Sequence, residues 1–368
     1  MTNKSSLSRR SFLGGLGLAG LASGMAALRA TVSGVHAQDP SQQGPQHSGQ
    51  TGNHVGTMAN MAEGEVNNQR NGFDPMAMLT DFDYGTVSTL PDGRTLREYE
   101  LIAADQLIEI APGVMFPAWS YNGRVPGPTL RCTEGDRLRI TFKNASSHPH
   151  SIHFHGIHPS GMDGLEPIGS GGTFVYEFDA EPFGLHLYHC HTVPIRRHIH
   201  KGLYGAFIVD PPTPRPAAHE LIMVMNAFDT DLDGANEFYA VNTVAFHYAK
   251  HPIPLKLNEL VRVYLVNVTE FDPINSFHLH ANMFHVFRTG TQLQPHEFTD
   301  MIMLAQGERH ILEFHYKFPG PYMFHAHQSE FAELGWMSMF VVTEEGAAAP
   351  SFEKASVFGV CDLTTGGL

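Results

Sequence analysis

The tripeptide His189-Cys190-His191 is the sequence feature that most constrains how this chain can fold. In an extended strand, successive side chains point to opposite faces, so the cysteine would point one way and both histidines the other. A thiolate could then bind a soft metal on one face while two imidazoles bind further metal on the other. Taken alone, the tripeptide also fits a zinc site or a packed core, so the other histidines must decide.

Histidine occurs in three further clusters with the same alternation. They are His150-Ser-Ile-His153-Phe-His155, His278-Leu-His280 and His325-Ala-His327. Each His-x-His pair would place two imidazoles on one face, whereas His150 would point to the opposite face, toward Cys190 on a neighbouring strand. Imidazole and thiolate are ligands that suit copper, whereas a hard cation would favour carboxylates. The pattern predicts one mononuclear copper site and a second site built from four histidine pairs.

The later half of the chain repeats the pairs without the mononuclear set. Asn275 stands where His150 stood, in NSFHLH against HSIHFH, and Ala326 stands where Cys190 stood, in FHAH against YHCH. The sequence therefore predicts a mononuclear site in the first half only.

Several short motifs accompany these clusters. They are Tyr121-Asn122-Gly123, Pro126-Gly127-Pro128, Glu134-Gly135-Asp136, Met162-Asp163-Gly164, Gly202-Leu203-Tyr204-Gly205 and Glu333-Leu334-Gly335-Trp336-Met337. With them, nearly all of residues 95–345 resembles the two-domain, laccase-like multicopper oxidases, whose type 1 copper lies in the first domain and which are related to copper nitrite reductases.

The resemblance implies a set of ligands for four coppers per chain. The type 1 copper would take His150, Cys190 and His198, with Leu203 at the axial position; His200 is the alternative to His198. The type 2 copper would take His153 and His278. The type 3 pair would take His155, His189, His191, His280, His325 and His327. Because Leu203 has no donor atom, we expect a raised type 1 potential.

The same resemblance implies the reaction. One-electron oxidation of a phenolic or metal-ion donor would be coupled to the four-electron reduction of dioxygen to water. That reaction needs protons, and Asp163 and Glu330 are the candidate relays, although either acid could instead belong to a surface turn.

Two other functions are alternatives to the oxidase. A copper-containing nitrite reductase shares the two-domain build, but its pattern has no histidine directly after the cysteine, so His191 argues against it. A periplasmic copper-binding or electron-transfer protein is the non-enzymatic alternative, motivated by 24 histidines.

Short apolar or alternating runs cut by glycine and proline predict an all-β chain of two Greek-key cupredoxin β-sandwich domains. The expected limits are 93–212 for the first domain, with the type 1 copper and half of the cluster, and 213–346 for the second. Since each domain supplies half of the eight histidines, the cluster must lie between a first and a second domain. The resemblance implies a homotrimer with that cluster between subunits.

The termini carry separate predictions. Residues 1–37, with Ser8-Arg9-Arg10-Ser11-Phe12-Leu13, resemble a twin-arginine signal peptide, so the mature protein would be periplasmic or secreted, without a membrane anchor. Residues 38–92 are expected to form a flexible extension and 347–368 a tail. The net charge of −14 makes nucleic acid an improbable partner. Cys132 and Cys361 are open as a disulfide or as two separate thiols.

Overall fold

The computed structural model describes residues 64–344. The predicted signal peptide, the tail at 347–368 and Cys361 lie outside these residues. Within the described part, no helix has both the length and the apolar character needed to cross a membrane.

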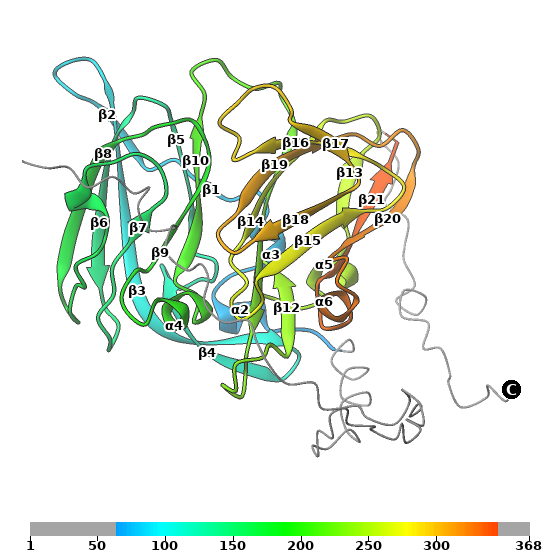
Figure 1. Cartoon of the computed structure of the whole chain (residues 1–368), viewed down its shortest axis with the longest axis horizontal. Helices are drawn as coiled ribbons and strands as arrows, with labels where there is room; N and C mark the ends of the chain where they lie inside the picture. Colours follow the sequence, from blue (N-terminus) through cyan, green and yellow to red (C-terminus); the bar gives the residue numbers. More distant parts are fainter. Residues whose placement is uncertain (1–63, 345–368) are drawn as a thin grey trace, which may run out of the picture. The chain divides into compact units, whose positions relative to one another are not determined.

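The first half of the chain is built from ten strands in two sheets (Figure 1). The first sheet has the order β1-β5-β10-β9-β7, and the second has the order β2-β3-β6-β8 with β4 paired to β3. The strands are β1 (Phe82–Asp83), β2 (Thr86–Thr89), β3 (Thr95–Ala111), β4 (Val114–Tyr121), β5 (Thr129–Thr133), β6 (Arg137–Asn144), β7 (His153–Phe154), β8 (Thr173–Asp179), β9 (Gly184–His189) and β10 (Tyr204–Asp210).

The second half repeats this plan with eleven strands. Its sheets have the orders β12-β11-β14-β19-β16-β17 and β13-β21-β20-β15-β18. The strands are β11 (His219–Phe228), β12 (Phe238–Val241), β13 (Ile253–Lys256), β14 (Val261–Asn267), β15 (Ile274–Leu279), β16 (Phe284–Arg288), β17 (Glu297–Thr299), β18 (Met301–Ala305), β19 (Arg309–Phe314), β20 (Gly320–His325) and β21 (Met337–Thr343).

Helical segments are short; two precede β1 and the others lie between strands. They are α2 (Asn68–Asn71), α3 (Pro75–Met78), the 3-10 turn η2 (Ser160–Met162), α4 (Ile195–His200), α5 (His247–Lys250) and α6 (Ser329–Glu333). Among the strands of residues 64–344, no sheet mixes those from before residue 211 with those from after residue 218. The prediction of an all-β chain with two cupredoxin-like sandwiches is therefore confirmed.

Side-chain alternation explains why these segments form sandwiches. In β6, the buried Leu138, Ile140 and Phe142 alternate with Arg139 and Lys143, which are at least partly exposed. Strand β14 is buried at every residue, because it packs into the core of its own sandwich on one face and against apolar side chains of the first half on the other.

The chain from residue 64 to residue 92 corrects the predicted flexible extension. This stretch forms α2, α3, β1 and β2, and Phe73, Met78 and Leu79 are buried in the apolar clusters of the protein. Three well-spaced apolar side chains are enough to fix a segment whose overall composition is polar.

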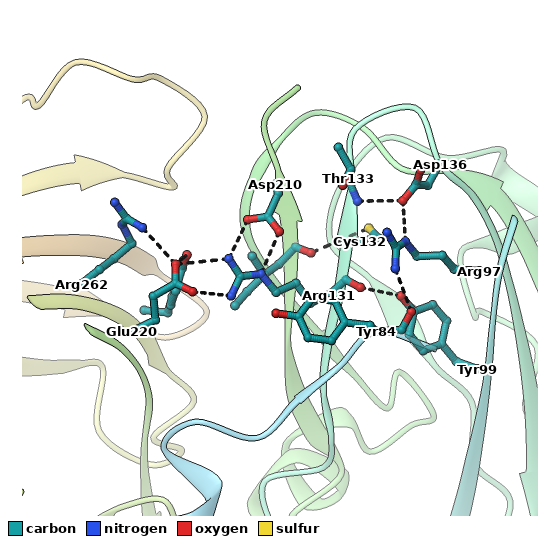
Figure 2. A network of polar contacts seen from close by, with 12 residues as sticks. Tyr84, Arg97, Tyr99, Arg131, Cys132, Thr133, Asp136, Asp210, Glu220 and Arg262 are labelled. Atoms are coloured by element: carbon teal, nitrogen blue, oxygen red, sulfur yellow. Dashed lines mark hydrogen bonds and ion pairs between the residues drawn. The ribbon is translucent and has the colours of Figure 1, made fainter. Parts of the chain in front are cut away.

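A buried ion network joins strands of the two halves (Figure 2). Arg131 of β5 donates to Asp210 of β10 over 2.8 Å and to Glu220 of β11 over 2.6 Å. Glu220 also accepts from Arg262 of β14 at 3.0 Å and from the hydroxyl of Tyr264 at 2.7 Å. Arg131 and Arg262 are both paired in this network, and removing one partner would leave an uncompensated charge at the junction of the two halves.

Cys132 lies beside this network. Its thiol is buried and free among the described residues, and burial raises its pKa. The predicted choice between a bridge and two separate thiols stays open, because Cys361 is not described.

Candidate metal centre

The first cluster of potential ligands combines one cysteine with two histidines in the core of the first half. His150 lies just before β7, Cys190 just after β9, and His198 in α4. The Nδ1 atoms of His150 and His198 are 3.1 Å apart, and the Cys190 Sγ lies 3.2 Å from the Nδ1 of His198 and 3.9 Å from that of His150. All three side chains are buried. The residues predicted for the mononuclear site are thus brought together.

The structure distinguishes the two histidines of α4. The Nε2 of His200 accepts the backbone N–H of Asp229 at 3.0 Å, and its ring packs edge-on against Phe116 and Phe271. His200 is therefore occupied elsewhere, and His198 is the residue that reaches Cys190.

Hydrogen bonds fix the tautomer of His150. The hydroxyl of Ser146 donates its only proton to the carboxylate of Asp105 at 2.6 Å, so its oxygen must accept from the Nε2 of His150, 2.9 Å away. The proton is then on Nε2, and the lone pair of Nδ1 points toward Cys190. Burial and the neighbouring His198 lower the pKa of His150 to about 3, so its ring is neutral at pH 7 and able to bind a metal.

Backbone hydrogen bonds fix the position of Cys190. The backbone N–H of Ser151 donates to Sγ at 3.4 Å, and the N–H of Cys190 donates to the carbonyl of Leu203 at 2.9 Å. Leu203 is fully buried. Two neutral nitrogens and one sulfur that converge in this way form a soft donor set and fit copper.

The second cluster lies on the opposite face of the same strands. His153 of β7 pairs across the sheet with His189 of β9. The ring of His153 lies 5.1–5.3 Å from the rings of His155, His189 and His191, and the Nε2 atoms of His155 and His189 are 3.2 Å apart. Alternation along β9 explains why these rings face away from Cys190.

The third cluster repeats the second in the later half. His278 of β15 pairs with His325 of β20, and its ring lies 5.0–5.5 Å from those of His280, His325 and His327. The Nε2 atoms of His280 and His325 are 2.9 Å apart. The eight histidines thus form two sets of four, which we call the first and second tetrads.

Backbone carbonyls orient corresponding rings of the two tetrads. His153 and His278 donate from Nδ1 to the carbonyls of Asp163 and Asp300, at 3.1 and 3.0 Å. His189 and His325 donate from Nδ1 to the carbonyls that follow them, at 3.0 and 2.6 Å. Each of these four rings therefore presents Nε2 as its free ligand atom, and the fixed orientation is typical of metal-binding histidines.

The tetrads do not combine within one chain. In the part of the chain that the structure describes, no group of three or more converging ligand atoms within 4.8 Å draws on both tetrads. His280 and His327 are exposed. Among residues 64–344, each tetrad is thus a separate candidate site.

The two predicted proton relays have different surroundings. A carboxylate oxygen of Asp163 lies 3.1 Å from the Nδ1 of His153, next to the first tetrad. Glu330 is exposed on α6, and among residues 64–344 no hydrogen bond or ion pair joins it to a histidine. The geometry favours Asp163 over Glu330.

Sequence reasoning missed three features of these sites. Asp300, the counterpart of Asp163, has a carboxylate oxygen 3.8 Å from the Nδ1 of His278. The Ser146 and Asp105 contacts that orient His150 were not foreseen. Trp119 was also missed: its ring lies 5.0 Å from that of His150 and 4.8 Å from that of His198. No sequence signal marks them: Asp163 follows His155 by 8 residues and Asp300 follows His280 by 20, and no local motif marks the others.

The acidic run Asp229-Thr-Asp231-Leu-Asp233-Gly234 forms a closed turn. The carboxylate of Asp229 accepts the backbone N–H groups of Leu232, Asp233 and Gly234. This arrangement is that of a plain acidic turn, in which the carboxylate caps its own loop.

Comparison with known proteins gives a consistent result. Two family models described as multicopper oxidase match residues 104–214 and 214–346. A solved structure described as a multicopper oxidase is 57% identical, with a TM-score of 0.75, over 76% of this chain and all of that chain.

Copper nitrite reductases are more distant. The protein of Neisseria meningitidis serogroup A is 28% identical over 67% of this chain and 69% of its own length. The solved structure of the Nitrosomonas europaea enzyme is 26% identical, with a TM-score of 0.62, over 67% of this chain and 94% of that chain.

Proposed function

This chain belongs to the multicopper oxidase family, and on that premise we propose that it is a laccase-like enzyme with four coppers per chain. It is an oxidoreductase of a family that uses dioxygen and an electron donor. The proposed donor is a phenol or a metal ion that gives up one electron at a time, and four such electrons with four protons convert one dioxygen into two molecules of water.

The observation that carries the proposal is the covalent continuity of His189, Cys190 and His191. Cys190 reaches the mononuclear set on one face, and its two neighbours belong to the first tetrad on the other. An electron accepted beside Cys190 would have a path of a few bonds to the tetrad.

The ligand assignment combines the three clusters with the division into copper types that the family resemblance implies. We assign the mononuclear copper to His150, Cys190 and His198, with Leu203 beside it, a type 2 copper to His153 and His278, and the type 3 pair to the remaining six histidines. Bound copper would supply the one-electron acceptor at the first site and the binding and reduction of dioxygen at the second.

The protein's own groups would hold the ligands and supply protons. The four Nδ1-to-carbonyl bonds keep the rings aimed with Nε2 free. The carboxylate of Asp163 lies beside His153 and near the surface, where it could pass a proton from solvent toward the tetrads.

The assembly we propose is a homotrimer in which the first tetrad of one subunit meets the second tetrad of the next. The separation of the tetrads within one chain supports a head-to-tail contact, and such contacts give a finite assembly only when they close into a ring. The family resemblance supplies the number three. The twin-arginine motif at Arg9 and Arg10 supports export to the periplasm or beyond.

Metal analysis combined with oxygen uptake tests the proposal. Copper-loaded protein should contain about four coppers per chain, absorb strongly in the visible from the Cys190 thiolate, and consume oxygen with a phenol or a reduced metal ion. About two coppers per chain together with nitrite-dependent turnover would favour a nitrite reductase. Tight copper binding with no oxygen uptake from any donor would favour a binding protein.

A further inference from the structure

A surface pocket of about 440 Å³ lies next to the proposed mononuclear copper site. Its lining combines apolar and cationic side chains with one carboxylate, and includes Asp105, Leu107, Pro117, Trp119, Arg197 and Lys201. Trp119 belongs both to this lining and to the shell of the copper ligands, because its ring contacts those of His150 and His198. A donor in the pocket would therefore be separated from the ligands by a single side chain.

The cations of the pocket have no acidic partner. The guanidinium of Arg197 lies over the ring of Trp119 at 5.5 Å and is exposed. The buried Lys201 donates to the carbonyl of Pro117 at 2.6 Å. Neither Arg197 nor Lys201 forms an ion pair with a carboxylate anywhere in residues 64–344.

The one carboxylate of the lining is engaged already. Asp105 accepts hydrogen bonds from the hydroxyls of Ser146 and Ser147 and from the backbone N–H of Ser147, at 2.6–3.0 Å. These bonds outweigh burial, which alone would raise its pKa, and hold the pKa of Asp105 below its usual value. The carboxylate therefore stays charged but has little capacity left to bind a cationic donor.

We propose that Arg197, supported by Lys201, makes this pocket select negatively charged aromatic donors over cationic ones. The inference rests on the proposed function and specifies the donor. The apolar side chains of Leu107 and Pro117 offer a wall for a ring, and the cations face its negative group. A phenolate would leave as a neutral phenoxyl radical after losing one electron, with no proton to dispose of. A metal cation would instead meet the positive charges of Arg197 and Lys201.

Three ferrocene donors of one shape and different charge test the proposal. They are ferrocenecarboxylate, which is an anion, neutral ferrocenemethanol, and the cation ferrocenylmethyl-trimethylammonium. Each reduces the copper-loaded, oxygen-free protein in a stopped-flow instrument, and bleaching of the visible band gives the second-order rate constant. The rate constant for the anion is divided by that for the cation, and this anion-to-cation ratio is compared between variants. The comparison cancels differences in donor potential and in copper potential.

The variants are Arg197→Gln, Arg197→Glu and the control Arg196→Glu. Arg196 neighbours Arg197 but lies over Phe271, outside the pocket lining. Arg196→Glu therefore changes the net charge by the same amount as Arg197→Glu without changing a residue of the pocket. At low ionic strength the anion-to-cation ratio should fall roughly threefold in Arg197→Gln and roughly tenfold in Arg197→Glu. It should change less than about twofold in Arg196→Glu, and 0.5 M salt should remove most of the difference.

The outcomes separate the two proposals. A ratio that stays within about twofold in Arg197→Glu, or that falls equally in both Glu variants, would overturn the selectivity while leaving the oxidase intact. A protein without the visible band, or one that no donor bleaches, would overturn the proposed function and this inference with it.

Discussion

The mononuclear ligand set of the first half and its counterpart in the second half show one scaffold used in two ways. In the first half, Cys190 N–H donates to the carbonyl of Leu203, and Leu203 N–H to that of His198. In the second half, Ala326 N–H donates to the carbonyl of Trp336, and Trp336 N–H to that of Phe331. The same backbone hydrogen bonds occur in both halves, but the converging side chains are the proposed metal ligands in the first half and apolar groups in the second.

The polar support of the site is also repeated. His150 donates to the hydroxyl oxygen of Ser146, and at the equivalent place the amide of Asn275 donates to the hydroxyl oxygen of Thr269 at 2.9 Å. The fully buried Trp336 packs against Phe277 and Phe324. A space in a cupredoxin core must be filled either by a metal with its ligands or by a large side chain, because voids are costly.

Removal of the Cys190 sulfur should have the largest effect on turnover and on the visible absorption. Cys190→Ser should remove the visible absorption and lower turnover by at least roughly a thousandfold, because the one-electron acceptor loses its thiolate ligand. The matched change Ala326→Ser should leave both properties within about twofold of the unmodified protein. Spectra and oxygen uptake of the two variants check this, and unaltered turnover in Cys190→Ser would refute the electron path.

The filling role of Trp336 should appear in stability. Trp336→Ala in the copper-free protein should lower the free energy of unfolding by roughly 3–5 kcal/mol, the usual result of a large core cavity. Leu203→Ala at the equivalent place should cost roughly 2–4 kcal/mol. Urea denaturation gives both values. A loss under about 1 kcal/mol for Trp336→Ala would show that neighbouring side chains of the second half move in to fill the cavity.

The two aspartates beside the tetrads should differ in their effect on turnover. Asp163→Ala should lower kcat by roughly 10–100-fold with copper content unchanged, because the carboxylate beside His153 is lost. Asp163→Asn keeps a hydrogen-bonding group but cannot exchange a proton, so it should be similarly slow. Asp300→Ala should have a smaller effect, since its carboxylate oxygen is 3.8 Å from its histidine rather than 3.1 Å.

Metal analysis alongside kcat distinguishes a role of Asp163 in proton transfer from a role in positioning the ligand His153. A loss of copper in Asp163→Ala would point to ligand positioning, and full activity in Asp163→Asn would exclude proton transfer by this residue.

The smallest expected change concerns the axial position. Leu203→Met places a thioether where Leu203 is buried, and the added donor should lower the type 1 potential. Leu203→Ile adds no donor atom and serves as the control. Redox titration of the visible band gives the potentials, and an equal or higher value for Leu203→Met would contradict the predicted role of the residue.

Much of the site could be predicted because strands convert spacing into geometry. A period of two places His153 with His155 and His189 with His191, and the offset of His150 sends it toward Cys190, as the structure shows. The correspondences of Asn275 with His150 and Ala326 with Cys190 are visible in the sequence for the same reason.

The remaining features depend on contacts between distant segments. Asp105 lies 41 residues before Ser146, and only the placement of β3 beside the loop after β6 brings them together. Trp119 reaches His150 from β4 in the same way. The polar composition of residues 64–92 predicts a flexible segment. In the structure, however, Phe73, Met78 and Leu79 are buried and pack this segment against the rest of the protein.

The separation of the tetrads has a consequence for how oxygen chemistry would be controlled. In the proposed assembly, a solitary subunit would carry the site that accepts electrons but only one tetrad of each pair that together would reduce dioxygen, so it could accept electrons without passing them to dioxygen. Subunit association would then control the reaction, because reactive oxygen intermediates could form only after a neighbouring subunit had completed the site and enclosed it.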